Sequence, residues 1–144
     1  MKSYFGSNGK FKSIIETPDW LMEELWEEFG SEHYDPCPVG PIEDGLAVSW
    51  NEKICKLGLG TWTYVNPPYS RGVIGQWVKK CREEHLDGLT PIVLLIPAYT
   101  DTAYFHDYIY NKHNVEIRFL RGRIKFKGYE GNRCSFPSML VVFK

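Results

Sequence analysis

Residues 61–96 read TWTYVNPPYSRGVIGQWVKKCREEHLDGLTPIVLLI, and this stretch decides the fold. Residues 61–66 are rich in β-branched and aromatic side chains and predict a strand, which Pro67 and Pro68 end. Residues 91–96 are continuously apolar, which is typical of a central strand covered on both faces. Apolar residues at helical spacing predict a helix between the two strands: Val73, Ile74, Trp77, Val78 and Cys81. A strand, a helix and a second strand in succession indicate an α/β sheet.

The flanking sequence extends this α/β pattern in both directions. Upstream, a helix is predicted in which Thr17 is the N-cap, Pro18 suits the first turn and Gly30 ends the helix. A short extended piece ends at Asp35. Downstream, the pattern predicts a helix over about residues 101–111 and strands over residues 115–120, 123–126 and 139–143. The prediction is a three-layer α/β fold with a mixed sheet and an antiparallel C-terminal edge.

Length and composition predict one domain without metal or disulfide support. The 144 residues are 43% apolar and 24% charged, which suits a globular chain with its own core. We therefore expect one domain over residues 1–144, with residues 1–13 as a flexible arm. Four widely spaced cysteines without a CxxC pair favour neither zinc nor disulfides, so no metal is expected. No apolar run is long enough to span a bilayer, so we expect no membrane association and a cytoplasmic location.

The charge is unevenly distributed along the chain, although the net charge is only −1. Residues 16–32 contain seven acids and no Lys or Arg, whereas residues 112–133 contain seven basic residues and two acids. In a strand over residues 123–126, period-two alternation would place four cations on one face: Arg121, Arg123, Lys125 and Lys127. We expect this face to contact phosphates, with Arg71 and Lys79-Lys80 as weaker candidates. The alternative is an ordinary solvated strand face.

The segment Asn66-Pro67-Pro68-Tyr69 follows a predicted strand at its carboxyl end, where open α/β sheets bind ligands. The two prolines fix φ and remove two N–H donors. The stiff turn offers the Asn66 side-chain oxygen and the Pro67 carbonyl as acceptors, and Tyr69 as an aromatic face. Two acceptors suit the two hydrogens of a planar amino group, whose nitrogen is a poor nucleophile, and Tyr69 suits stacking on an extruded base. The alternative is a simple strand terminator with a surface aromatic residue.

With these residues in place, the chain resembles the amino-methyltransferases that carry a (Asp/Asn/Ser)-Pro-Pro-(Tyr/Phe/Trp) motif. More narrowly, it resembles the short, phage-type Dam-like DNA N6-adenine methyltransferases. The resemblance runs from about Thr17 to Phe143, and it is specific in the joint order of its pieces. These are TPDW (17–20), YDPCP (34–38), DGLAVSW (44–50), YVNPPYS (64–70), LLIPAYTDTAYFHDYI (94–109), FLRGRIKF (119–126) and FPSMLVVF (136–143).

The resemblance implies a class I S-adenosylmethionine-dependent methyltransferase fold. It implies methyl transfer from S-adenosylmethionine to the N6 amino group of adenine in DNA, without a metal. Asn66, Pro67, Pro68 and Tyr69 are then the catalytic turn. The cofactor-binding residues would be Thr17, Pro18, Asp35, Pro36, Asp44 and Asn66. Asp35 and Asp44 have plain turn-forming roles as alternatives. A phage-encoded enzyme would act in the bacterial host cytoplasm, where methylation can protect phage DNA from restriction.

The sequence departs from the family pattern at the cofactor turn, because no GxG follows Asp35 and the chain reads DPCPVGPIEDG instead. It also leaves no room for a separate target-recognition domain. DNA is the expected partner, and no protein partner is inferred. Three alternatives share these features: N4-cytosine methylation, methylation of a protein glutamine amide, and a non-catalytic DNA-binding module with a degenerate cofactor site.

Overall fold

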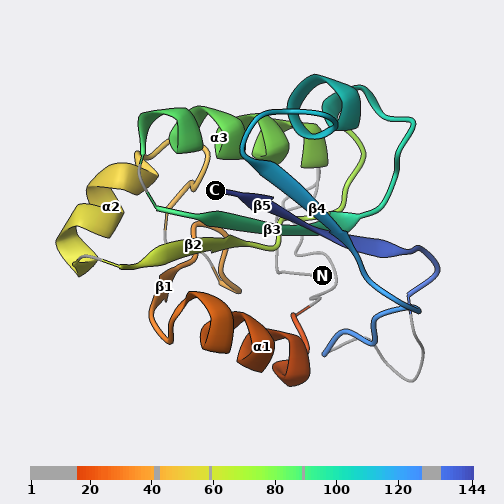
Figure 1. The fold of residues 1–144 in the computed structure, drawn as a ribbon, viewed down its shortest axis with the longest axis horizontal. Helices are drawn as coiled ribbons and strands as arrows, with labels where there is room; N and C mark the ends of the chain where they lie inside the picture. Colours follow the sequence, from red (N-terminus) through yellow and green to blue (C-terminus); the bar gives the residue numbers. More distant parts are fainter. Residues whose placement is uncertain (1–15, 41–42, 59, 89, 128–133) are drawn as a thin grey trace.

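The computed structural model describes residues 16–40, 43–58, 60–88, 90–127 and 134–144. The predicted N-terminal arm, residues 1–13, lies outside the described residues. A five-stranded mixed sheet has the order β1-β2-β3-β5-β4 (Figure 1). Its strands are β1 (His33–Tyr34), β2 (Trp62–Val65), β3 (Ile92–Pro97), β4 (Val115–Phe119) and β5 (Ser138–Phe143). β1, β2 and β3 are parallel, and β5 pairs antiparallel with both β3 and β4. The predicted mixed sheet is therefore confirmed.

Helices cover both faces of the sheet (Figure 1). They are α1 (Asp19–Phe29), α2 (Trp50–Leu57), α3 (Ile74–Asp87) and the π-helix η1 (Phe105–Ile109). In β5, Met139 and Val141 pack with α2, α3 and η1, whereas Leu140 and Val142 pack with α1. This period-two alternation between two apolar layers explains why β3 and β5 are buried at every position.

Three local predictions are wrong. Thr17 does not cap α1; the N-cap is Pro18, without a side-chain cap. The helix predicted over residues 101–111 is shorter in the structure, where it is the π-helix η1. Tyr110 N–H donates to the carbonyl of Phe105, five residues earlier, at 2.7 Å. Asn111 then turns the chain with a φ of 54°.

The third error is the strand predicted over residues 123–126, which is not part of the sheet. Residues 123–126 do not pair with the edge strand β4, because Ile124 and Phe126 pack into the apolar layer of α1 instead. Outside the sheet, a β-bridge joins Glu16 to Lys127. The predicted alternation holds, since Ile124 and Phe126 are buried while Arg123, Lys125 and Lys127 are exposed.

α2 was not predicted, although Ser49 and Gly58 delimit it. The Ser49 side chain accepts from Glu52 N–H at 3.3 Å. The buried Glu84 of α3 holds the start of α2, since its Oε2 accepts from the backbone N–H groups of Trp50 and Asn51 at 3.1 and 3.3 Å. Its Oε1 pairs with Lys80 at 2.8 Å. One carboxylate therefore satisfies N–H groups that a helix leaves without intrahelical partners.

Replacing Glu84 should destabilise the protein by removing these acceptors. We expect Glu84→Ala to lower the free energy of unfolding by about 1–3 kcal/mol, the cost of leaving buried N–H groups unsatisfied. Glu84→Gln, which keeps an acceptor oxygen, should lose less. The control is Glu83→Ala, which removes an exposed neighbour and should change stability by no more than about 0.5 kcal/mol. Denaturant unfolding measures all three, and equal effects at positions 83 and 84 would contradict this account.

Candidate functional site

The parallel strands bring the predicted site residues to one edge of the sheet. Asp35 follows β1, Asn66 follows β2 and Ala98 follows β3, and the three strands are adjacent and point the same way. The carboxyl edge of a parallel sheet is where such folds bind ligands. Segments far apart in the sequence therefore meet where the site was predicted.

Hydrogen bonds to the side-chain amide of Asn66 hold the Asn-Pro-Pro-Tyr turn in place. Asn66 is 1% exposed, Pro67 and Pro68 are buried, and Tyr69 is half-buried. The Asn66 Nδ2 donates to Thr17 Oγ1 at 3.3 Å. The Tyr69 hydroxyl lies 2.7 Å from Asn66 Oδ1 and 3.1 Å from the Leu95 carbonyl oxygen. The amide is thus fixed at both ends.

The Thr17 hydroxyl also forms a hydrogen bond with the hydroxyl of Tyr64, two residues before Asn66. Burial raises the pKa of Tyr64 well above its usual range, and the charge of Asp35 adds to the shift against a lowering by the Thr17 bond. Burial likewise raises the pKa of Tyr69, with smaller contributions from Tyr64 and Cys134. Both phenols therefore keep their protons at neutral pH, and Tyr69 is the donor to Asn66 Oδ1.

The ring of Tyr69 packs edge-to-face with two aromatic residues that the sequence interpretation did not assign to the site. Its centroid lies 6.1 Å from that of Phe126 and 5.6 Å from that of Phe136, with interplanar angles of 73° and 80°. Phe126 belongs to the extended segment that carries the exposed cations. The predicted catalytic turn and the predicted DNA-binding segment are therefore in contact. In this arrangement the Tyr69 hydroxyl is hydrogen-bonded to Asn66 Oδ1, the oxygen that was predicted to accept a hydrogen bond from a substrate.

The two acidic turns predicted to bind a cofactor lie against each other. Asp35 Oδ1 accepts from Cys37 N–H at 2.8 Å, and Asp44 Oδ1 accepts from Leu46 N–H at 3.0 Å. Gly45 packs on the backbone of Pro36 so closely that a Cβ would lie 2.0 Å from the Pro36 carbonyl oxygen. Both carboxylates shape their own turns, as the plain turn-forming alternative required, and the glycine brings the turns together.

The predicted cations are all exposed, but they differ in their partners. Arg71 lies just beyond the catalytic turn. Lys127 pairs with Asp19 at 2.7 Å and lies 4.0 Å from Glu16. Within the described part of the chain, Arg121, Arg123 and Lys125 have no ion pair or hydrogen bond. The three unpaired cations are the better candidates for phosphate contacts, because Lys127 is partly neutralised already.

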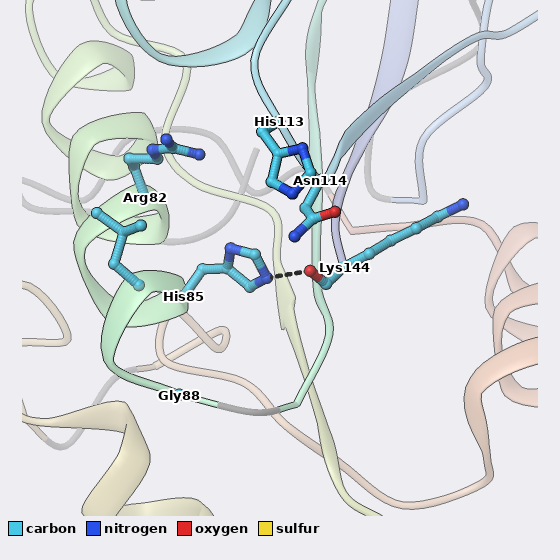
Figure 2. Close-up of a pocket in the computed structure, with 7 residues that line it drawn as sticks. Arg82, His85, Gly88, His113, Asn114 and Lys144 are labelled. Atoms are coloured by element: carbon cyan, nitrogen blue, oxygen red, sulfur yellow. Dashed lines mark hydrogen bonds between the residues drawn. The ribbon is translucent and has the colours of Figure 1, made fainter.

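A separate cavity of about 340 Å³ lies at the opposite edge of the sheet, near the end of α3 and the start of β4 (Figure 2). It is lined by Arg82, His85, Leu86, Gly88, His113, Asn114 and Lys144. His85 Nε2 donates to the Lys144 carbonyl oxygen at 2.6 Å. None of the predicted site residues lines it, so this cavity is not part of the carboxyl-edge site.

Other features of the described residues bear on the site only indirectly. The four cysteines are free thiols, of which Cys55 alone is exposed. Among the described side chains, no three His, Cys, Asp or Glu residues gather in a way that could hold a metal ion. None of the helices in the described ranges combines the length and apolarity that crossing a bilayer requires.

Comparison with known proteins places the chain in a family. The family model described as DNA N-6-adenine-methyltransferase (Dam) matches residues 8–144. No curated protein and no solved structure matches the chain. The family match covers nearly the whole chain and includes every residue of the catalytic turn. The chain belongs to the DNA N-6-adenine-methyltransferase (Dam) family.

Proposed function

We propose that this chain transfers a methyl group from S-adenosylmethionine to the N6 amino group of adenine in DNA. The observation that carries the proposal is the buried Asn66 amide at the carboxyl end of β2, held with its oxygen toward Tyr69. Membership of the Dam family supports the same reaction. We also propose that residues 1–144 act as one methyltransferase domain of the class I type.

The chemistry follows from the acceptors of the turn. The lone pair of an adenine amino group is conjugated into the ring, so the nitrogen is a weak nucleophile. Asn66 Oδ1 and the Pro67 carbonyl would accept its two hydrogens and favour a pyramidal nitrogen. Correct positioning of reacting groups can contribute on the order of 7–11 kcal/mol. Tyr69 would stack on the extruded base. Its hydroxyl must first leave Asn66 Oδ1, and the Leu95 carbonyl is an alternative acceptor 3.1 Å away.

The residues at the carboxyl edge fit S-adenosylmethionine in kind. The cofactor presents an ammonium group, ribose hydroxyls and an adenine amino group, all of which are donors that carboxylates accept well. Asp35, Pro36 and Asp44 lie in two adjoining turns beside the catalytic turn. The cofactor carries no phosphate, so a glycine-rich anion cradle is not required. We propose these residues, with the backbone of Thr17, Pro18 and Asn66, as the wall of the cofactor site. When bound, the cofactor supplies the methyl group from its sulfonium.

The proposed DNA contacts lie on the segment that packs against the catalytic turn. Phe126 lies beside Tyr69, and the exposed Arg121, Arg123 and Lys125 precede it or alternate with it. DNA held by these cations through its phosphates would be held close to the turn that accepts the base. Phosphate contacts set the position of a duplex without reading its sequence. The net charge of −1 makes such a localised patch more relevant than the overall charge.

Transfer of labelled methyl groups to defined DNA, followed by nucleoside analysis, tests the reaction. N6-methyladenine is the expected product. N4-methylcytosine or label in protein would replace this proposal with a different acceptor. Absence of S-adenosylmethionine binding in calorimetry would indicate a DNA-binding module without catalysis.

Asn66→Ala should reduce kcat by about 10²–10³-fold, the scale seen when one oriented polar contact to a reacting group is removed. Cofactor affinity should change little, because the amide is proposed to act mainly on the base. Single-turnover kinetics and calorimetry measure the two quantities. Asn114→Ala, which removes an exposed amide at the opposite edge of the sheet, is the control and should keep full activity. A near-normal kcat in a folded Asn66→Ala protein would contradict the assignment.

Neutralising Arg121, Arg123 or Lys125 singly should lower the slope of log Kd against log salt concentration by about one. Arg71→Ala tests the cation beside the catalytic turn in the same way. Lys127→Ala should change the slope less, because Lys127 is paired with Asp19. Lys53→Ala on α2 serves as the control, because this lysine pairs with Glu43 and was not predicted to contact phosphates. Unchanged slopes at positions 121, 123 and 125 would remove the segment from the DNA interface.

A further inference from the structure

Three buried polar side chains form a continuous hydrogen-bonded chain that ends at the proposed acceptor oxygen. Tyr64 bonds to Thr17, Thr17 accepts from Asn66 Nδ2, and Asn66 Oδ1 faces the Tyr69 hydroxyl. Thr17 is 8% exposed, Tyr64 2% and Asn66 1%. Burying such groups is unfavourable unless they are hydrogen-bonded, so each member fixes the next.

The orientation of the Asn66 amide decides what the turn can bind. The oxygen and nitrogen ends of an amide have nearly the same shape, and only their partners distinguish them. In the structure Thr17 Oγ1 accepts from Nδ2, and the oxygen end accepts from the Tyr69 hydroxyl. A flipped amide would present N–H groups to the hydrogens of an amino substrate, and donor would face donor.

Rigid surroundings keep the Thr17 hydroxyl in place. Tyr64 lies in β2, two residues before Asn66, which directly follows the strand, so period-two alternation directs both side chains to the same side. Its ring packs at right angles to His33, with centroids 6.1 Å apart, and against Trp62 at the same separation. Thr17 directly precedes the Pro18 that begins α1, which packs through Leu21 and Leu25 on the same layer.

We propose that Thr17 and Tyr64 are positioning residues that hold the Asn66 amide oxygen toward the substrate amino group. The inference rests on the proposed methyl transfer to an amino group, and it assigns a role to Tyr64, to which the sequence analysis gave none. According to this proposal, the Thr17 hydroxyl orients the acceptor oxygen of Asn66 and does not contact the cofactor. Neither residue touches the base, and both act through Asn66.

Thr17→Val tests the proposal, because valine has the shape of threonine without the acceptor. We expect kcat to fall by about 10²-fold, the scale of a small misplacement at the reacting centre. The Kd for S-adenosylmethionine and the KM for DNA should stay within about threefold of the wild-type values. In free energy, a threefold change is roughly half the contribution of one hydrogen bond. Thr17→Ser restores the hydroxyl and should restore kcat. Tyr64→Phe should lower kcat by roughly tenfold, the value of one hydrogen bond.

The matched control is Thr63→Val, which removes a fully buried threonine hydroxyl one residue from Tyr64. The Thr63 Oγ1 has no hydrogen-bond partner among the described residues. This variant should keep its kcat, whereas a general intolerance of valine near β2 would lower it. Thermal unfolding of every variant separates loss of kcat from loss of folded protein.

A second readout does not depend on activity. The side-chain amide protons of Asn66 in ¹⁵N-labelled protein should exchange slowly with solvent and shift in Thr17→Val but return in Thr17→Ser. Unchanged amide signals, or a kcat for Thr17→Val equal to that of Thr63→Val, would overturn the positioning role. If the wild-type protein methylates no amino group while the amide signals respond as expected, the proposed function fails. The hydrogen-bonded chain of Tyr64, Thr17 and Asn66 then has a structural role only.

Discussion

β3 is buried from Ile92 to Pro97, with a helical layer on each side of it. Both faces of this strand must be apolar, and its neighbours must be strands, because no backbone group there can reach water. The rest of the architecture follows from this constraint. β2 runs parallel to β3 on one side, and its last residue delivers Asn66 to the edge where β3 delivers Ala98.

The same burial gives the proposed site its chemical character. A solvent-exposed asparagine rotates freely, and water competes for both ends of its amide. Asn66 instead sits beside Thr17, Tyr64 and Tyr69, where each hydroxyl has few alternatives. Hydrogen bonds are stronger in such surroundings, and an unpaired group is more costly. An acceptor oxygen held in this way is oriented before a substrate arrives, so little reorganisation is left for the reaction.

The sequence alone was sufficient to predict those features of the fold that depend on the types of neighbouring residues along the chain. The apolar runs of β3 and β5 and the Pro67-Pro68 stop after β2 could all be recognised without coordinates. The position of the catalytic turn at a strand end followed from the same signals.

Features that depend on distant partners were missed. Residues 123–126 alternate as a strand does, but their apolar side chains pack into the layer of α1 and the segment does not pair with the edge strand β4. Thr17 resembles a helix cap, yet its hydroxyl bonds to residues 47 and 49 positions away. The bond of Tyr69 to Asn66 likewise arises from packing against Phe126 and Phe136, and the contact of Glu84 with α2 spans more than 30 residues.

The placement of β5 between β3 and β4 has a consequence for biogenesis. Among the described residues, β4 pairs with β5 alone, so β4 joins the sheet only after β5 has been synthesised as far as Phe143. Until then, the apolar edge of β3 stays open to other chains, and slow translation of β5 would favour aggregation.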